Sequence, residues 1–207
     1  MWKDRSEAAQ ELVTRLKQLA LPFDIVLALP RGGVILGAII ARAFKKPLDL
    51  LIPRKIGAPS NEEYAIGAVT EEGIAVWNEE EKASVDPSWL EHMVAKQRAE
   101  ATRRRLTYLG SAHRRDLRGK SILIVDDGIA TGLTMMAAIA EARQLQAGKI
   151  LLAIPVAPPD TLERIRPDVE GVAVLSAPAS FGAVGAFYEN FPQVTDAEVI
   201  SLLKEFL

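Results

Sequence analysis

Two neighbouring acids stand directly after a run of apolar residues, in the segment ILIVDDGIATGLT at positions 122–134. The apolar run predicts a buried strand, so Asp126 and Asp127 fall at its carboxyl end, where parallel α/β sheets bind ligands. Carboxylates in that position can accept hydrogen bonds from vicinal hydroxyls or hold a divalent cation. The acid pair therefore indicates a ligand that carries hydroxyls, a cation or both.

The turn after the acids has the composition of an anion site. A helix is expected to begin there, so backbone N–H groups, two hydroxyls and the positive end of a helix dipole converge on one point. Gly132 lets the backbone approach an anion without an intervening side chain. The expected phosphate-binding residues are Ala130, Thr131, Gly132, Leu133 and Thr134. Together with the acids, this turn predicts a site for a ribose 5-phosphate.

A plainer interpretation is a helix N-cap, in which the Asp and Thr side chains only satisfy backbone donors. The complete ordered run weighs against that interpretation. A nucleotide-binding P-loop is excluded, because the pattern GxxxxGK[ST] is absent and no lysine follows Gly132.

Glycines and basic residues follow two earlier predicted strands. Arg31, Gly32 and Gly33 come after the apolar run 24–29, and Arg54 and Lys55 come after the run 48–52. Glycine permits unusual backbone φ values, and arginine offers a fork of donors to phosphate. Alone, the first group could be a tight connection and the second ordinary strand-end solvation. Beside the acid pair, the Arg31–Gly33 turn is a second candidate anion position at a strand end.

The ordered run resembles a known signature. Val125-Asp126-Asp127, followed by Ala130-Thr131-Gly132 and Thr134, is similar over its full length to the phosphoribosyl pyrophosphate signature of the type I phosphoribosyltransferases. One departure is Gly128, where many members carry a branched apolar residue. The resemblance implies a transferase that moves a 5-phosphoribosyl group from phosphoribosyl pyrophosphate to a heterocyclic nitrogenous acceptor, releasing pyrophosphate.

The resemblance also assigns roles to the predicted site residues. Asp126 and Asp127 would hold the ribose hydroxyls and bind Mg²⁺, directly or through water. The turn at 130–134 would bind the 5-phosphate. Pyrophosphate would be bound by Arg31, Gly32, Gly33, Arg54 and Lys55. The expected catalytic set is Asp126, Asp127, Arg31 and Lys55.

Two further segments resemble family features. Residues 56–68, with the polar centre Ser60-Asn61-Glu62-Glu63, would be the flexible active-site loop, although a plain β-hairpin is a compatible interpretation. Residues 177–192, with an N-terminal contribution, would form the hood over the acceptor. Its expected contact residues are Phe181, Val184, Phe187 and Tyr188. Aromatic faces stack on flat heterocycles. These aromatics could equally seal the end of the core.

The elements that must position these residues follow from the apolar pattern. Strands are expected at 24–29, 48–52, 121–126, 149–155 and 172–176, and helices at 6–19, 34–44, 133–146 and 159–166. Two short strands are expected at 65–69 and 74–77, and a long charged helix opens at Asp86-Pro87 and ends near Gly110. Continuous apolar strands alternating with helices predict an α/β fold. We expect a single domain over 1–207, with a mostly parallel, doubly wound sheet, helices on both faces, a hood and a hairpin-like loop.

Composition limits the function. The 207 residues carry a net charge of −2, no cysteine and two histidines, which argues against nucleic acid and membrane partners, thiolate chemistry and a histidine metal site. Without a convincing transmembrane or signal segment, we expect a cytoplasmic protein. Arg103, Arg104 and Arg105 are interpreted as complementing the dipole at the end of the long helix, and Arg114 and Arg115 extend this basic run.

An alternative function remains open. Some relatives of this fold regulate rather than catalyse, and such a protein would bind phosphoribosyl pyrophosphate or a nucleotide in the same pocket without transfer. The two acids, the basic strand ends and the lid-like loop favour the enzyme. The resemblance also implies that the chain can pair as a homodimer. The acceptor's identity does not follow from the sequence.

Overall fold

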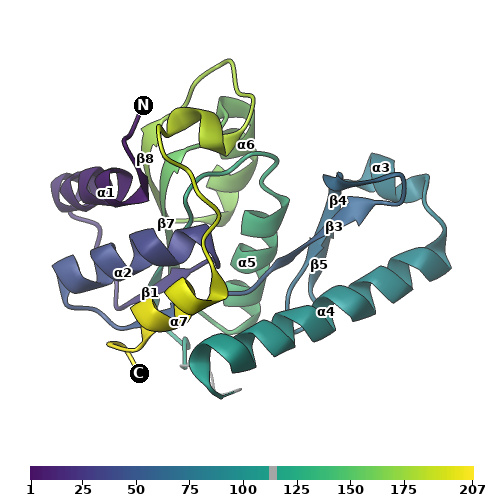
Figure 1. Ribbon diagram of the computed structural model, residues 1–207, viewed down its shortest axis with the longest axis horizontal. Coiled ribbons are helices and arrows are strands. Elements are labelled where there is room, and N and C mark those ends of the chain that lie inside the picture. Colours follow the sequence, from purple (N-terminus) through teal and green to yellow (C-terminus); the bar gives the residue numbers. More distant parts are fainter. Residues whose placement is uncertain (112–115) are drawn as a thin grey trace.

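The structure, a computed structural model, describes residues 1–111 and 116–207, and for Glu63 it describes only the backbone. Arg114 and Arg115 of the basic run lie outside the described residues, as does the Glu63 side chain of the predicted loop. The chain forms a layered α/β body with one arm that extends from it (Figure 1).

The body is built on a parallel sheet of five strands in the order β2-β1-β6-β7-β8. The strands are β1 (Ile25–Ala28), β2 (Leu48–Leu50), β6 (Ser121–Val125), β7 (Lys149–Val156) and β8 (Gly171–Ser176). β6 is central, and every neighbouring pair in this sheet is parallel. The predicted α/β fold class is confirmed. The acid pair follows the central strand, so the carboxyl ends of β1 and β7 flank it.

Helices cover both faces of this sheet, which explains why its strands are apolar at successive positions. α1 (Arg5–Leu19), α2 (Gly32–Phe44) and α7 (Asp196–Leu203) pack with Leu123 and Val125 of β6. α5 (Leu133–Gln144) and α6 (Pro159–Ile165) pack with the alternate residues Ile122 and Ile124. Two short 3₁₀ turns, Arg166–Asp168 and Val184–Phe187, complete this part of the chain.

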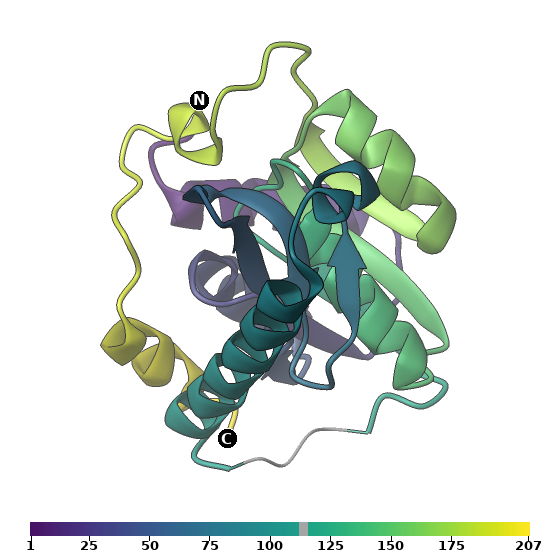
Figure 2. The same ribbon diagram turned by 90° about the vertical axis from the view of Figure 1, so that its right-hand side faces the viewer.

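The arm comprises β3 (Arg54–Ala58), β4 (Asn61–Val69), β5 (Ala75–Trp77), α3 (Glu79–Ala83) and α4 (Pro87–Leu109). Its three strands form a separate antiparallel sheet in the order β3-β4-β5. One face packs on α4 and the other on α5, so the sheet lies between a long outer helix and the body (Figure 2). The predicted loop at 56–68 is therefore mostly strand, with its turn at Pro59-Ser60. Its closure over a site stays a prediction.

Within the described residues, no helix is both long and apolar enough to cross a membrane. The longest described helix, α4, is held to the body by Arg105, whose side chain is 1% exposed. Arg105 donates to Glu71 Oε2 at 2.7 Å and to the Leu50 carbonyl at 2.7 Å, and it lies 3.5 Å from Asp49 Oδ1. The sequence interpretation of Arg103–Arg105 as dipole partners is wrong, because the last turn of α4 contains no basic residue.

Replacing Arg105 with methionine should destabilise the protein by about 3–5 kcal/mol, because a buried ion pair that loses one partner leaves charge uncompensated. Urea unfolding followed by circular dichroism measures this change. Lys96→Met, at an exposed position of the same helix, is the matched control and should unfold like the wild type. Equal midpoints for Arg105→Met and the wild type would show that the arm does not depend on this anchor.

Candidate active site

The turn after β1 and the acid pair after β6 touch each other. Parallel pairing of the two strands brings their carboxyl ends together, and the Leu29 amide donates to the Val125 carbonyl at 3.0 Å. A Cβ on Gly32 would lie 1.8 Å from Asp127 Oδ2, and a Cβ on Gly33 would lie 2.7 Å from the Val125 oxygen. Both positions therefore require glycine. The structure brings the predicted pyrophosphate turn against the predicted acid pair.

The turn at 130–134, which is predicted to bind phosphate, is oriented by hydrogen bonds from α6. Thr161 Oγ1 donates to the Ala130 carbonyl at 2.9 Å, and Arg164 Nη2 donates to the Thr131 carbonyl at 3.1 Å. Because the C=O and N–H of a trans peptide point in opposite directions, these bonds turn the amides of Thr131 and Gly132 the other way. Gly132 has φ +82° and precedes the first turn of α5, whose amides lack intrahelical partners. The turn thus presents consecutive N–H groups on one side.

The two acids differ in their surroundings. Burial, reinforced by the neighbouring charge of Asp127, raises the pKa of Asp126 well above its ordinary value. Burial also raises the pKa of Asp127, but the guanidinium of Arg5 opposes that change. Arg5 Nε lies 2.7 Å from Asp127 Oδ2, and both side chains are largely buried. Asp127 is therefore the acid of the pair whose ionised form has a cationic partner.

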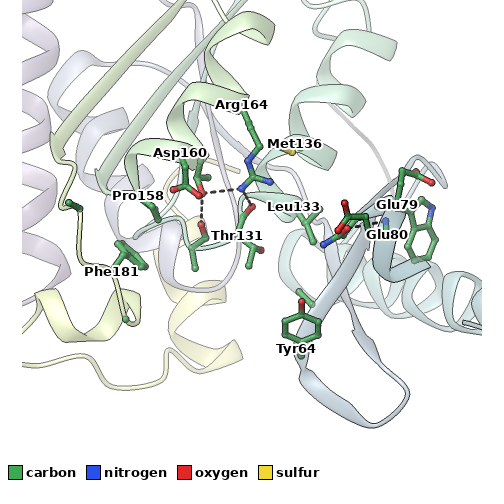
Figure 3. A pocket seen from close by; sticks show the side chains of 17 residues that line it. Tyr64, Glu79, Glu80, Thr131, Leu133, Met136, Pro158, Asp160, Arg164 and Phe181 are labelled. Atoms are coloured by element: carbon green, nitrogen blue, oxygen red, sulfur yellow. Dashed lines mark hydrogen bonds between the residues drawn. The ribbon is translucent and has the colours of Figure 1, made fainter. Parts of the chain in front are cut away.

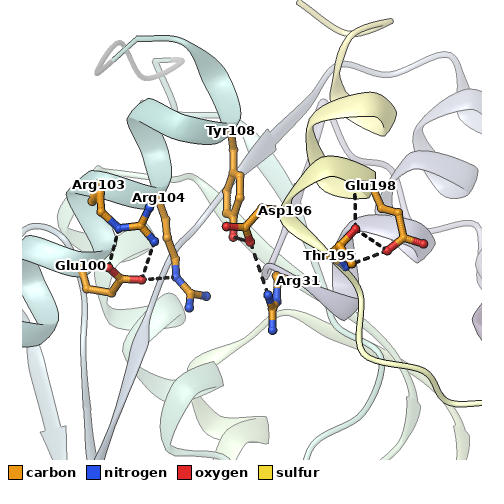
Figure 4. A network of polar contacts seen from close by, with 8 residues as sticks. All are labelled: Arg31, Glu100, Arg103, Arg104, Tyr108, Thr195, Asp196 and Glu198. Carbon is orange, nitrogen blue, oxygen red and sulfur yellow. Dashed lines mark hydrogen bonds and ion pairs between the residues drawn. The ribbon is translucent and has the colours of Figure 1, made fainter.

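Arg31, the predicted pyrophosphate ligand, contacts the first residue of α7. Its Nη1 is 3.4 Å from Asp196 Oδ1, and Tyr108 Oη donates to the same oxygen at 2.8 Å (Figure 4). Burial and this hydrogen bond raise the pKa of Tyr108 to about 12, so the phenol stays a donor. Asp196 thereby fixes the Arg31 side chain beside the turn that follows β1. The Arg31 side chain is 26% exposed.

The structure separates the predicted Arg54-Lys55 pair onto two faces of β3, because neighbouring residues of a strand point opposite ways. Arg54 Nε donates to Gln97 Oε1 of α4 at 3.2 Å. Lys55 pairs across the strands with Ala68, which packs on α5. Burial, together with the positive charge of Arg104, lowers the pKa of Arg54. Arg104 is thus a cation near Arg54 that the sequence did not assign to the site.

The predicted hood lies over the acid pair and is tied to it. Tyr188 Oη donates to the Asp127 carbonyl at 2.6 Å, and its ring stacks on Phe191 at 4.8 Å. Val184 explains the departure from the family signature, since a Cβ on Gly128 would lie 2.4 Å from Val184 Cγ1. Phe181 and Phe187 pack against each other with ring centroids 5.2 Å apart. Of these four aromatics, Tyr188 is buried and so is a positioning group rather than an exposed contact.

A cavity of about 990 Å³ opens between the arm, the turn at 130–134 and the hood (Figure 3). Thr131 and Arg164 lie at its centre, with Phe181 on one side and Tyr64 of β4 on the other. The acid pair does not line this space. Ala130 and Thr131, which line the cavity, belong to the turn that follows the acid pair, so the cavity lies next to the acids.

Comparison with known proteins places this chain in a family. The family described as phosphoribosyl transferase domain matches residues 7–185. The chain belongs to this family. The match includes both predicted anion turns, the arm and the start of the hood, while Arg5 lies just before it.

Two curated relatives from Mycobacterium tuberculosis, "Putative phosphoribosyl transferase MT0597" of strain CDC 1551 / Oshkosh and "Putative phosphoribosyl transferase Rv0571c" of strain ATCC 25618 / H37Rv, are each 39% identical over 205 residues. The match covers 98% of this chain but 46% of either relative, so the chain spans about half their length. The crystal structure of TT1426 from Thermus thermophilus is 38% identical, covers 100% of this chain and 99% of its own, and has a TM-score of 0.82.

Arg5 is the site residue that the sequence interpretation missed. It is the first residue of α1, where a positive charge is unfavourable for the helix dipole, and it is 7% exposed. A cation at the wrong end of a helix is a weak signal that another group holds it. Over the described residues, no group of three or more His, Cys, Asp or Glu side chains could hold a metal. A cation at the acid pair would therefore need ligands from elsewhere.

Replacing Thr161 with valine keeps the shape of the side chain and removes its bond to the Ala130 carbonyl. We expect roughly fivefold weaker binding of ribose 5-phosphate, the scale of one hydrogen bond, because the turn loses its fixed orientation. An NMR titration measures this affinity. Thr14→Val removes a comparable hydrogen bond at an exposed position of α1 and should leave the affinity unchanged. Wild-type affinity in Thr161→Val would remove this orienting function.

The Glu100 cluster beside Arg31 gives a pH prediction (Figure 4). Hydrogen bonds from Arg103 and then Arg104 hold the pKa of Glu100 at about 2, against an ordinary 4.5. A carboxylate with a depressed folded-state pKa stabilises the fold above its unfolded pKa and loses that effect as the pH falls through the folded one. Urea unfolding should therefore separate the wild type from Glu100→Gln above pH 4.5 and converge near pH 2. A difference that persists at the acid end would assign the effect to packing.

Proposed function

We propose that this protein is a Mg²⁺-dependent phosphoribosyltransferase, which transfers a 5-phosphoribosyl group from phosphoribosyl pyrophosphate to a nitrogenous base or base-like acceptor. The observation that carries this proposal is the direct contact of the Gly32 turn with Asp127. A donor with phosphate at one end and pyrophosphate at the other needs two anion sites separated by a sugar. In this proposal the ends of β1 and β6 would supply such a pair.

The proposed donor would lie across these strand ends. Its 5-phosphate would accept hydrogen bonds from the amides of the turn at 130–134, with Thr131 and Thr134 adding hydroxyls. Its ribose hydroxyls would donate to Asp126 and Asp127. Its pyrophosphate would lie against Gly32 and Gly33 with Arg31, and Arg54 and Lys55 would approach from the arm. Binding energy from the phosphate thereby positions the reacting carbon.

Transfer would break the bond between ribose C1 and pyrophosphate while the acceptor nitrogen forms a new one. Positive charge grows on the sugar ring in such a reaction, and negative charge grows on the leaving group. The carboxylate of Asp127 would stabilise the first charge, and Arg31 the second. Asp196 and Tyr108 would keep Arg31 in place during this change. No side-chain nucleophile is needed.

The acid pair suits Mg²⁺, because this ion is usually bound by one or two carboxylates together with substrate phosphates. Asp126 and Asp127 would hold it, directly or through water. When bound, the ion would neutralise charge on the departing pyrophosphate. Burial raises the pKa of Asp126, and a neighbouring cation would oppose that change by favouring the ionised carboxylate.

The acceptor would occupy the cavity beyond Thr131, where Phe181 offers a ring face. A regulator that only senses the donor has no need of such a second space, which favours the transferase. To test the proposal, the protein is incubated with phosphoribosyl pyrophosphate, Mg²⁺ and single bases, and pyrophosphate release is followed. Release with one base class supports transfer. Donor binding without release from any base would support the regulator instead.

Asp127→Asn should lower the transfer rate by about 10²-fold or more, the scale of losing one electrostatic contact to the transition state. Steady-state kinetics with the base that the screen selects measures this effect. Asp168→Asn is the matched control, since Asp168 lies in the 3₁₀ turn just before the amino end of β8, whereas the acid pair follows the carboxyl end of β6. Activity within twofold of wild type in Asp127→Asn would remove Asp127 from this role.

A further inference from the structure

Arg5 makes contacts with three parts of the molecule that meet at the site. Its Nε donates to Asp127 Oδ2 at 2.7 Å, and its Nη1 donates to the Pro192 carbonyl at 2.8 Å. Its guanidinium carbon lies 3.7 Å from the centroid of the Phe191 ring. A Cβ on Gly32 would lie 3.1 Å from Arg5 Nε. The guanidinium is therefore in contact with the ribose acid and the hood, and it lies against the pyrophosphate turn.

Each of these contacts uses a property specific to arginine. The planar guanidinium can donate in two directions at once while its face lies on an aromatic ring. Burying such a group costs free energy unless its charge and its donors are matched. Asp127 supplies the charge, Pro192 a second acceptor and Phe191 the ring. A lysine would keep the charge but could not make all three contacts in this geometry.

The N-terminal segment carries Arg5 into place by pairing with the hood. The Trp2 amide donates to the Phe187 carbonyl at 2.9 Å, and the Glu189 amide donates to the Trp2 carbonyl at 2.8 Å. Trp2 also packs against Tyr188, with ring centroids 5.4 Å apart. Since Tyr188 donates to the Asp127 carbonyl, Asp127 is linked to the hood through its backbone and, by way of Arg5, through its side chain.

We propose that Arg5 is a positioning residue, which fixes the orientation of the Asp127 carboxylate for ribose hydroxyls and couples that carboxylate to the hood. By holding one carboxylate oxygen, Arg5 determines where the other oxygen points. The ribose hydroxyls would then meet a carboxylate oxygen of fixed orientation. The hood would keep its position relative to that oxygen. This inference rests on the proposed function, because it assumes that Asp127 contacts a ribose.

Two ligands that differ only in the sugar test the inference. Ribose 5-phosphate and methyl phosphate share the phosphate monoester, so the ratio of their dissociation constants reports the contribution of the sugar. NMR titration gives both constants for the wild type, Arg5→Gln and Arg5→Lys. Arg42→Gln, which removes an exposed arginine–glutamate pair, is the matched control. Thermal unfolding of each variant shows whether it is folded.

In the wild type, ribose 5-phosphate should bind roughly tenfold or more tightly than methyl phosphate, the scale of charge-assisted hydrogen bonds. In Arg5→Gln this ratio should fall towards one, while the affinity for methyl phosphate changes less than twofold. Arg5→Lys should give an intermediate ratio, and it carries the test alone if Arg5→Gln does not fold. Arg42→Gln should keep the wild-type ratio.

Other outcomes would overturn the inference in distinguishable ways. An unchanged ratio in both folded Arg5 variants would show that Arg5 is only a structural counterion. Equal weakening of both ligands would assign Arg5 to general folding of the site. A higher ratio in the variants would mean that Arg5 blocks Asp127 rather than positions it. If the wild type binds neither ligand, the proposed function fails with it, and that result appears before any variant is compared.

Discussion

The contact between the turn after β1 and the acid pair after β6 constrains the rest of the site. Parallel pairing of two central strands brings these turns together, and at position 32 only glycine leaves room for the Asp127 carboxylate. Placing two carboxylates next to each other is electrostatically costly, and burial adds to that cost. Arg5 offsets part of this cost by pairing with Asp127. Elsewhere in the site, α6 orients the backbone amides of the turn at 130–134, and Asp196 with Tyr108 holds Arg31.

Much of this architecture follows from local pattern. Apolar runs bounded by turn residues predict the five parallel strands, because a strand covered on both faces needs apolar residues at successive positions. The order of acids, small residues and hydroxyls at 122–134 predicts an anion site at the end of the central strand, and the glycines at 32 and 33 predict a tight turn. These are properties that a short segment largely determines for itself. The roles of these residues towards a donor are still predictions.

What the sequence did not predict depends on contacts between distant segments. Arg5 and Asp127 are 122 positions apart, and their pairing depends on how the N-terminal helix docks beside the hood. Trp2, near the start of the chain, likewise pairs with the hood at Tyr188. Position 128 departs from the family signature for a similar reason, because Val184 occupies the space that a side chain would need. Arg54 and Lys55 are adjacent in sequence, but the alternation of side chains along β3 places them on opposite faces of the arm's sheet.

The central claim is that the two adjacent turns bind the two ends of one phosphoribosyl donor. Isothermal titration calorimetry with phosphoribosyl pyrophosphate in the presence of Mg²⁺ tests this claim without assuming an acceptor. Saturable binding at one site per chain, weakened when ribose 5-phosphate and pyrophosphate are added together as competitors, is the predicted result. Absence of binding at millimolar donor would contradict the account. So would competition by pyrophosphate alone, with no effect of ribose 5-phosphate, because only one of the two turns would then be an anion site.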